Sequence, residues 1–282
     1  MYIKSPLNYT GGKYKILSAV FSTFPDSIGT FVDLFAGGFN VGINTDAETI
    51  LCNDQIPYLI ELYEHFASHD ISFVLSEIRE RIDEFRLTQE NACGYQALRE
   101  RYNTTKSPVD LFVLTCYSFN HQIRFNSRHM FNTPFGRNRS SYNAAIEQNL
   151  IRFCEALHTK NIEFHTGDFL SLDLSGLGGQ DLVYCDPPYL ISTGSYNDGK
   201  RGFKDWTETE EKQLLDLLDR LDRQGTRFAL SNVLYHKGMS NDLLLSWSEH
   251  YHIHEIEKTY SNCSYHVKDR SARTLEVVIT NY

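Results

Sequence analysis

Two hydrophobic patterns alternate along the chain. Short apolar runs that end at Gly, Asp or Pro predict buried strands, and longer segments with apolar residues every three or four positions predict helices. Strands are expected at the start of 30–42, at 49–54, at 162–169, at 181–186 and at 226–232, with a terminal strand pair at 250–258 and 274–282. Helices are expected at 56–66, across the charge-rich stretch 70–107, at 109–119, which is apolar enough to be buried, and after Thr207.

The helix after Thr207 carries signals at both ends. Thr207 and Glu210 have the spacing of a capping box, and Gly225 is placed to end the helix. One face between them is apolar and consists of Leu214, Leu217, Leu218 and Leu221.

The middle of the chain differs from both flanks. Residues 120–143 are polar, basic and rich in turn formers, which predicts a loop or hairpin. Strands and helices alternate regularly on either side of this middle segment. The pattern predicts an α/β fold, a doubly wound sheet with an inserted, mainly helical domain that carries the hairpin. We place the sheet domain at 1–66 and 144–282 and the inserted domain at 67–143.

Composition narrows the class of protein. The six cysteines are scattered without a C-x-x-C pair, which disfavours a zinc site or a disulfide framework and predicts reduced thiols in a cytoplasm. There is no apolar run of membrane-spanning length and no apolar signal segment after Met1, so no membrane partner is expected. No metal is implied.

The net charge of −9 disfavours a nonspecific nucleic-acid coat protein. A local basic patch nevertheless exists, because no acidic residue lies between Asp110 and Glu147. The arginines in this interval are Arg124, Arg128, Arg137 and Arg139. The interval is a candidate DNA contact, and the alternative is a solvated basic loop.

Two features follow the first two strands. Asp33 to Gly38 reads D-L-F-A-G-G, a turn in which glycine would let a ligand approach the backbone. Asp54 ends the next strand, where nucleotide-binding sheets often place an acid that accepts ribose hydroxyls. The alternatives are an ordinary tight turn and an Asp that caps the helix from Ile56.

Asp186, Pro187, Pro188 and Tyr189 follow a buried strand. This group suits methylation of an exocyclic amine on a nucleobase, whose nitrogen lone pair is delocalised into the ring. A carboxylate and a backbone carbonyl would each accept one N–H and expose the lone pair. The prolines would fix the carbonyl, and the Tyr ring would stack on an extruded base.

These stretches occur in the order found in Dam-like DNA adenine-N6 methyltransferases, and the chain resembles that family over most of its length. The matching segments are "PLNYTGGKYKIL" (6–17), "FVDLFAGGFNVG" (31–42), "NDQIPYLIELY" (53–63), "RFNSRHMFNTPFGRN" (124–138), "GDF" (167–169) and "DPPY" (186–189). The resemblance implies a Rossmann-like methyltransferase sheet, S-adenosyl-L-methionine as cofactor and a flipped adenine in duplex DNA as substrate.

The resemblance also implies residue roles. Tyr9 would lie beside the cofactor, Lys13 would hold its methionine carboxylate, and Asp54 would accept its ribose hydroxyls. Asp33, Phe35 and Gly37 belong to the turn that would wrap the methionine portion, and Asp168 and Phe169 would bracket the cofactor's adenine. Asp186 and Tyr189 would hold the target adenine, with the Pro187 carbonyl as second acceptor.

The basic interval would read DNA. The residues whose types suit base edges are Asn120, Gln122, Arg124 and Asn126, and those that suit phosphates are Arg128, Arg137 and Arg139. Three departures from the family concern positions that face DNA: Asn8 replaces a Lys, Asn120-His121-Gln122 replaces Asn-Gly-Leu, and Asn138 replaces a Tyr. These departures do not support GATC as the target, and the recognition sequence stays open.

Several alternatives stay open on sequence grounds. They are methylation of cytosine N4, methylation of a protein glutamine or an RNA base, and a catalytically inactive DNA-binding regulator. A restriction endonuclease would be a partner in function, not in contact. His250, His252 and His254 would share one strand face, as a solvent-facing stripe or a metal site. The Gly-rich segment 190–206 would close over DNA or only connect two elements.

Overall fold

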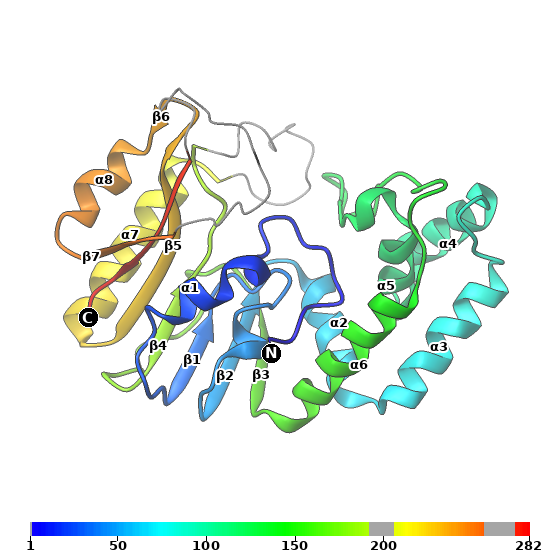
Figure 1. Ribbon diagram of the computed structural model, residues 1–282, viewed down its shortest axis with the longest axis horizontal. Helices are drawn as coiled ribbons and strands as arrows, with labels where there is room; N and C mark the ends of the chain where they lie inside the picture. Colours follow the sequence, from blue (N-terminus) through cyan, green and yellow to red (C-terminus); the bar gives the residue numbers. More distant parts are fainter. Residues whose placement is uncertain (1, 192–205, 257–273) are drawn as a thin grey trace.

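The computed structural model describes residues 2–191, 206–256 and 274–282 (Figure 1). Its described strands form one sheet in the order β3-β2-β1-β4-β5-β8-β7, and a short β6 pairs with β5. The bounds are β1 (Thr30–Asp33), β2 (Thr49–Asp54), β3 (Ile162–Thr166), β4 (Leu182–Cys185), β5 (Arg227–His236), β6 (Met239–Ser240), β7 (His252–Glu255) and β8 (Leu275–Thr280). β3, β2, β1, β4 and β5 are parallel, and β8 runs antiparallel between β5 and β7.

Every predicted helix is present, and the stretch 70–107 forms two helices. The helices are α1 (Leu17–Phe21), α2 (Pro57–Ser68), α3 (Ile71–Glu84), α4 (Ala92–Thr105), α5 (Pro108–Tyr117), α6 (Ala144–Thr159), α7 (Glu208–Gln224) and α8 (Asp242–Ser248). Of these, α1, α6 and α8 were not predicted. Helical turns of the 3₁₀ type occur at Lys13–Ile16, Gly42–Asn44 and Phe119–His121. The capping box of Thr207 and Glu210 is present, and Gly225 ends α7 with a φ of 80°.

Both faces of the sheet are covered, which explains why its strands are apolar without alternation. On β1, Phe31 belongs to a core shared with α1, α2 and α6, whereas Val32 belongs to a core shared with α7 and α8. On β4, Tyr184 and Val183 divide in the same way. The doubly wound sheet is confirmed.

Helices α3, α4 and α5 lie beyond α2 and α6, to one side of the sheet (Figure 1). They enter between β2 and β3, and Asp110 links them: its buried carboxylate pairs with Arg81 of α3 at 3.2 Å and with Arg101 of α4 at 2.6 Å. Val74, Leu98 and Phe112 of these helices belong to the same hydrophobic cluster as Phe31 of β1. The helical segment therefore shares its core with one face of the sheet.

Residues 118–136 form an irregular hairpin, as expected for this polar stretch. Isolated antiparallel bridges join Ser118 to Phe135 and Phe125 to Phe131. Asn126 closes the tip, because its Oδ1 accepts the backbone N–H groups of Arg128 (2.9 Å) and Met130 (3.1 Å).

The boundaries of some predicted elements differ. β3 stops at Thr166, three residues early, because the chain turns at 168–171, where the Ser171 N–H donates to the Asp168 carbonyl at 2.8 Å. The strand expected at 226–232 continues to His236. On β7, an edge strand, His252 is exposed and His254 bonds Thr280 at 3.2 Å, but Ile253 is exposed as well, so the strand has no apolar face.

Other sequence predictions concern thiols, metal sites, membrane helices and the segment 190–206. The described cysteines, Cys52, Cys93, Cys116, Cys154 and Cys185, are all free thiols. Within the described ranges no His, Cys, Asp and Glu side chains gather into a metal-sized group. No helix in those ranges is both long and apolar enough to cross a membrane. Most of segment 190–206 lies outside the described residues.

Candidate active site

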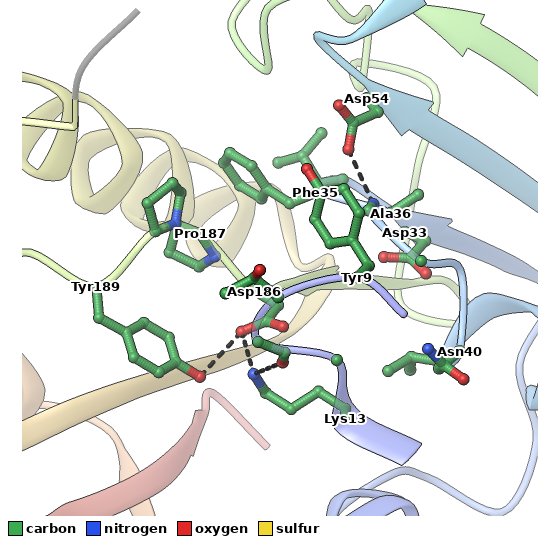
Figure 2. Close-up of a pocket in the computed structure, with 18 of the residues that line it drawn as sticks. Tyr9, Lys13, Asp33, Phe35, Ala36, Asn40, Asp54, Asp186, Pro187 and Tyr189 are labelled. Carbon is green, nitrogen blue, oxygen red and sulfur yellow. Dashed lines mark hydrogen bonds and ion pairs between the residues drawn. The ribbon is translucent and has the colours of Figure 1, made fainter. Parts of the chain in front are cut away.

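The carboxyl ends of β1, β2 and β4 meet at one edge of the sheet and open into a cavity of about 1370 Å³ (Figure 2). Ligands of open parallel sheets bind at this edge. The cavity is lined by every residue that the sequence suggested for cofactor and catalysis: Tyr9, Lys13, Asp33, Phe35, Gly37, Asp54, Asp168, Phe169, Asp186, Pro187, Pro188 and Tyr189.

The glycine turn after β1 holds a shape that only glycine accepts at position 37. Gly37 has a φ of 48°, and a Cβ there would lie 2.8 Å from the ring of Tyr9. Asp33 secures the far side of the turn, because its Oδ2 accepts the Gly42 N–H at 2.9 Å. Burial raises the pKa of Asp33 to about 7, and the nearby Asp186 adds to this rise.

Asp54 connects β2 to the same turn. Its Oδ2 accepts the Gly37 N–H at 2.8 Å (Figure 2). Its Oδ1 accepts the Ile56 N–H, also at 2.8 Å. The second bond is made to Ile56, the residue before α2, and not to an N–H group of the helix itself, so Asp54 is not the N-cap of α2. Burial raises the pKa of Asp54 to about 6, against the effect of these two hydrogen bonds.

The turn after β3 contributes Asp168 and Phe169. Asp168 Oδ1 accepts the Leu170 N–H at 3.0 Å, and the buried Phe169 ring lies 5.3 Å from the Phe35 ring between centroids. A third ring, that of Trp206, joins this pair, and sequence reasoning did not single it out.

Asp186 stands at the end of β4, with its carboxylate held from one side. Its Oδ1 accepts hydrogen bonds from the Lys13 ammonium at 2.6 Å and from the Tyr189 hydroxyl at 2.9 Å (Figure 2). Among the contacts of the described residues, none is made by Oδ2. Burial raises the pKa of Asp186, while the charge and hydrogen bond of Lys13 lower it.

Lys13 contacts acidic side chains of the protein at the edge of the cavity. Its side chain is only 5% exposed, and its ammonium pairs with Asp186 and lies 5.0 Å above the Tyr189 ring. The nearest carboxylates thus belong to the protein, and its contact with a methionine carboxylate stays a prediction.

Glu276 of β8 is a site residue that sequence reasoning missed. It is 6% exposed, its Oε1 lies 3.8 Å from the Lys13 ammonium, and it accepts the Tyr189 hydroxyl at 3.4 Å. Its signal in the sequence was a lone acid within the apolar strand LEVVIT, since a charge in a buried strand needs a partner.

Of the candidate DNA-binding residues, Arg124 reaches the cavity, which Ile123 and Phe125 also line. Arg139 instead donates to Asn120 Oδ1 at 3.0 Å and stacks on the exposed Phe119 ring at 4.6 Å. Gln122 and Arg128 on the hairpin and Arg137 directly after it are absent from the cavity lining.

The Asn126 side chain serves the fold of the hairpin tip. Both lone pairs of its Oδ1 are used by backbone N–H groups. A bidentate contact with an adenine edge requires that oxygen as an acceptor. A contact of Asn126 with an adenine edge would require these backbone bonds to be given up, and it stays a prediction.

Comparison with known proteins agrees with this geometry. The chain is 51% identical to type II methyltransferase M.FokI of Planomicrobium okeanokoites and 46% identical to modification methylase StsI of Streptococcus sanguinis, in each case over 100% of this chain and 43% of the relative. The chain thus spans less than half the length of these two relatives. It is also 30% identical to the DNA adenine methylase of Serratia marcescens over 68% of both chains.

A family model covers residues 9–262, from the start of the cavity lining to beyond β7. It describes D12 class N6 adenine-specific DNA methyltransferases. This match confirms the resemblance drawn from the ordered motifs, and the chain belongs to the D12 class N6 adenine-specific DNA methyltransferase family.

Proposed function

We propose that this chain transfers a methyl group from S-adenosyl-L-methionine to N6 of a flipped adenine in duplex DNA. One observation carries the proposal. The DPPY residues face the same cavity as Asp54 and the glycine turn, with Arg124 on its lining. A base held by the first group would thereby meet a nucleoside cofactor held by the second.

The contacts of Asp186 suit the acceptance of an amine proton. Because Lys13 and Tyr189 both donate to Oδ1, the carboxylate is oriented and Oδ2 is left to accept one N6–H of the adenine. The Pro187 carbonyl accepts the other, and the two acceptors direct the nitrogen lone pair toward the cofactor. When bound, S-adenosylmethionine supplies an electrophilic methyl group on its sulfonium.

The residues present fit that cofactor. Each Asp54 oxygen keeps one lone pair after its backbone contact, so it can accept a ribose hydroxyl. Gly37 brings the backbone close without a Cβ, and the apolar rings of Phe35 and Phe169 offer flat surfaces for a base. In this assignment Tyr9 lies against the methionine portion.

We assign catalysis and cofactor binding to 1–66 and 144–282, and target recognition to 67–143. The support is the position of the hairpin, which brings Arg124 to the cavity while Arg128, Arg137 and Arg139 remain exposed. Exposed arginines without neighbouring acids suit a phosphate backbone.

Methyl transfer to unmethylated duplex DNA with labelled cofactor tests the proposal directly. Hydrolysis of the product to nucleosides should give N6-methyl-2′-deoxyadenosine. If the label is found in N4-methyl-2′-deoxycytidine, the target is cytosine N4. If the DNA carries no label, the result favours an inactive DNA-binding regulator. Sequencing of the methylated DNA then gives the recognition site.

The wider setting is also part of the proposal. Two relatives are named modification methylases or type II methyltransferases, which supports a restriction-modification role. A cognate endonuclease would recognise the same DNA without contact with this chain. A cytoplasmic location follows from such a role.

Replacement of Glu276 by Gln should shift the pH dependence of methyl transfer. Asp186 must be ionised to accept the amine proton, and the negative charge of Glu276 contributes to its raised pKa. Loss of that charge lowers the pKa of Asp186, so the acidic limb of the kcat profile moves to lower pH. Single-turnover rates between pH 5 and 9 measure the shift. A profile that moves to higher pH contradicts the assigned roles.

Replacement of Arg124 and of Arg139 by Ala should have different effects on DNA binding. Arg124→Ala should cost about 1–3 kcal/mol on the cognate site and relax discrimination at one base pair. Arg139→Ala should weaken all duplexes alike and reduce the slope of log affinity against log salt by about one. Binding to cognate and single-mismatch duplexes at several salt concentrations separates the two.

Arg220→Ala, on the exposed side of α7, is the matched control and should change neither property. If Arg124→Ala weakens every duplex equally, the hairpin acts only as an electrostatic clamp and sequence is read elsewhere.

A further inference from the structure

Three aromatic rings meet on the cavity wall, and each comes from a different part of the chain. Phe35 follows β1, Phe169 follows β3, and Trp206 precedes α7. The ring centroids of Trp206 lie 5.6 Å from Phe35 and 5.7 Å from Phe169. All three residues line the cavity, so together they form an apolar wall suited to a planar base.

The indole of Trp206 is held by a fully buried carboxylate. Its Nε1–H donates to Glu211 Oε2 at 2.6 Å, and Glu211 is 0% exposed. The other oxygen of Glu211 accepts from Asn241 at 3.0 Å and from Asn232 at 3.1 Å. A buried carboxylate is costly unless donors satisfy it, and here three side chains do so.

The position of this wall relative to Asp54 identifies the base that it would contact. The Gly167 N–H donates to the Asp54 carbonyl at 3.1 Å, two residues before Phe169. The turn that carries Phe169 therefore starts beside the backbone of Asp54, the residue whose carboxylate is assigned to the ribose, whereas Tyr189 stands beside Asp186. A nucleoside whose ribose lies at Asp54 would direct its base toward these rings.

We propose that Trp206 forms a wall of the pocket for the cofactor's adenine and that Glu211 is a positioning residue that fixes the indole plane. The inference rests on the proposed use of a nucleoside cofactor. Trp206, which lies outside the motifs that identified the family, thereby gains a binding contact. The buried carboxylate of Glu211 gains the role of holding the Trp206 indole in place.

Fluorescence gives a direct test, because the chain contains two tryptophans. Trp247 bonds Asp219 at 2.7 Å between α8 and α7 and is absent from the cavity lining, so Trp247→Phe leaves Trp206 as the only reporter. S-adenosylhomocysteine should change the emission of this variant saturably, with the dissociation constant that calorimetry gives. The matched Trp206→Phe protein, which retains Trp247, should show no change.

Affinity separates stacking from other roles. Trp206→Ala should raise the dissociation constant for S-adenosylhomocysteine about tenfold or more, the usual effect of losing a base-stacking ring. The dissociation constant for 5′-methylthioadenosine, which lacks the amino-acid portion, should rise by the same factor.

A double-mutant cycle tests Glu211 as a positioning residue. Glu211→Gln and Trp206→Phe should each weaken S-adenosylhomocysteine binding several-fold, and the double variant should be no weaker than Trp206→Phe alone. Additive losses would mean that Glu211 acts through Asn232 and Asn241 and would overturn its assigned role.

The outcomes also separate this inference from the proposed function. If calorimetry shows S-adenosylhomocysteine binding but Trp206 emission and Trp206→Ala affinity are unchanged, the wall assignment is wrong and the function survives. If the wild-type protein binds no S-adenosylhomocysteine, both fail.

Discussion

Asp186→Ala should reduce methyl transfer by at least about 10²–10³ while cofactor binding is retained. A lost contact that acts only in the transition state has an effect of this size, and Asp186 supplies both an acceptor and a local negative charge. The protein should still fold, because the buried ammonium of Lys13 keeps Glu276 as a carboxylate neighbour at 3.8 Å. Single-turnover transfer with labelled cofactor measures the rate.

Asp216→Ala, an exposed carboxylate on α7, is the control and should transfer at the wild-type rate. A folded Asp186→Ala protein with near-normal turnover would falsify the assignment of DPPY to the target base.

Asp54→Ala should weaken cofactor binding with little direct effect on DNA affinity. The ribose would lose two hydrogen bonds to a carboxylate, worth roughly 1.5–3 kcal/mol each, so the dissociation constant should rise by at least about a hundredfold. Calorimetry with S-adenosylhomocysteine measures this constant.

The wild-type affinity should also depend on pH. The pKa of Asp54 is about 6 in the free protein, and ribose hydroxyls donate to the ionised form. Cofactor affinity should therefore fall as the pH drops below about 6, and Asp54→Ala should lose that component. If the affinity of Asp54→Ala is unchanged at pH 8, the carboxylate serves only the glycine turn and the start of α2.

The features that sequence predicted were local ones. Strands buried on both faces read as unbroken apolar runs, and the capping box of Thr207 with Gly225 marked both ends of α7. DPPY was interpretable because each of its residue types has a chemical reason at a strand end. Its neighbours in the chain were sufficient for that argument.

Features that depend on strand order were not predictable in this way. Glu276 reaches the site because β8 lies beside β5, far from Asp186 in sequence. In the sequence Trp206 is only a residue that precedes a predicted helix. Its contacts with Phe35 and Phe169 depend on the fold. The role of Lys13 at the methionine carboxylate was assigned by analogy to the family. Its contact with Asp186 was not predictable, because it depends on how the first turn folds onto β4.

The interior position of β8 has a consequence for synthesis on the ribosome. The parallel strands β1 to β5 leave the exit tunnel first and can pair early, but β5 keeps an unpaired edge until Leu275–Thr280 emerge. Val277 and Val278 then complete opposite cores, and Glu276 completes the cavity. A chain that has not yet exposed Leu275–Thr280 therefore lacks one wall of the cavity, and a chain cut before Leu275 presents an apolar strand edge that favours aggregation.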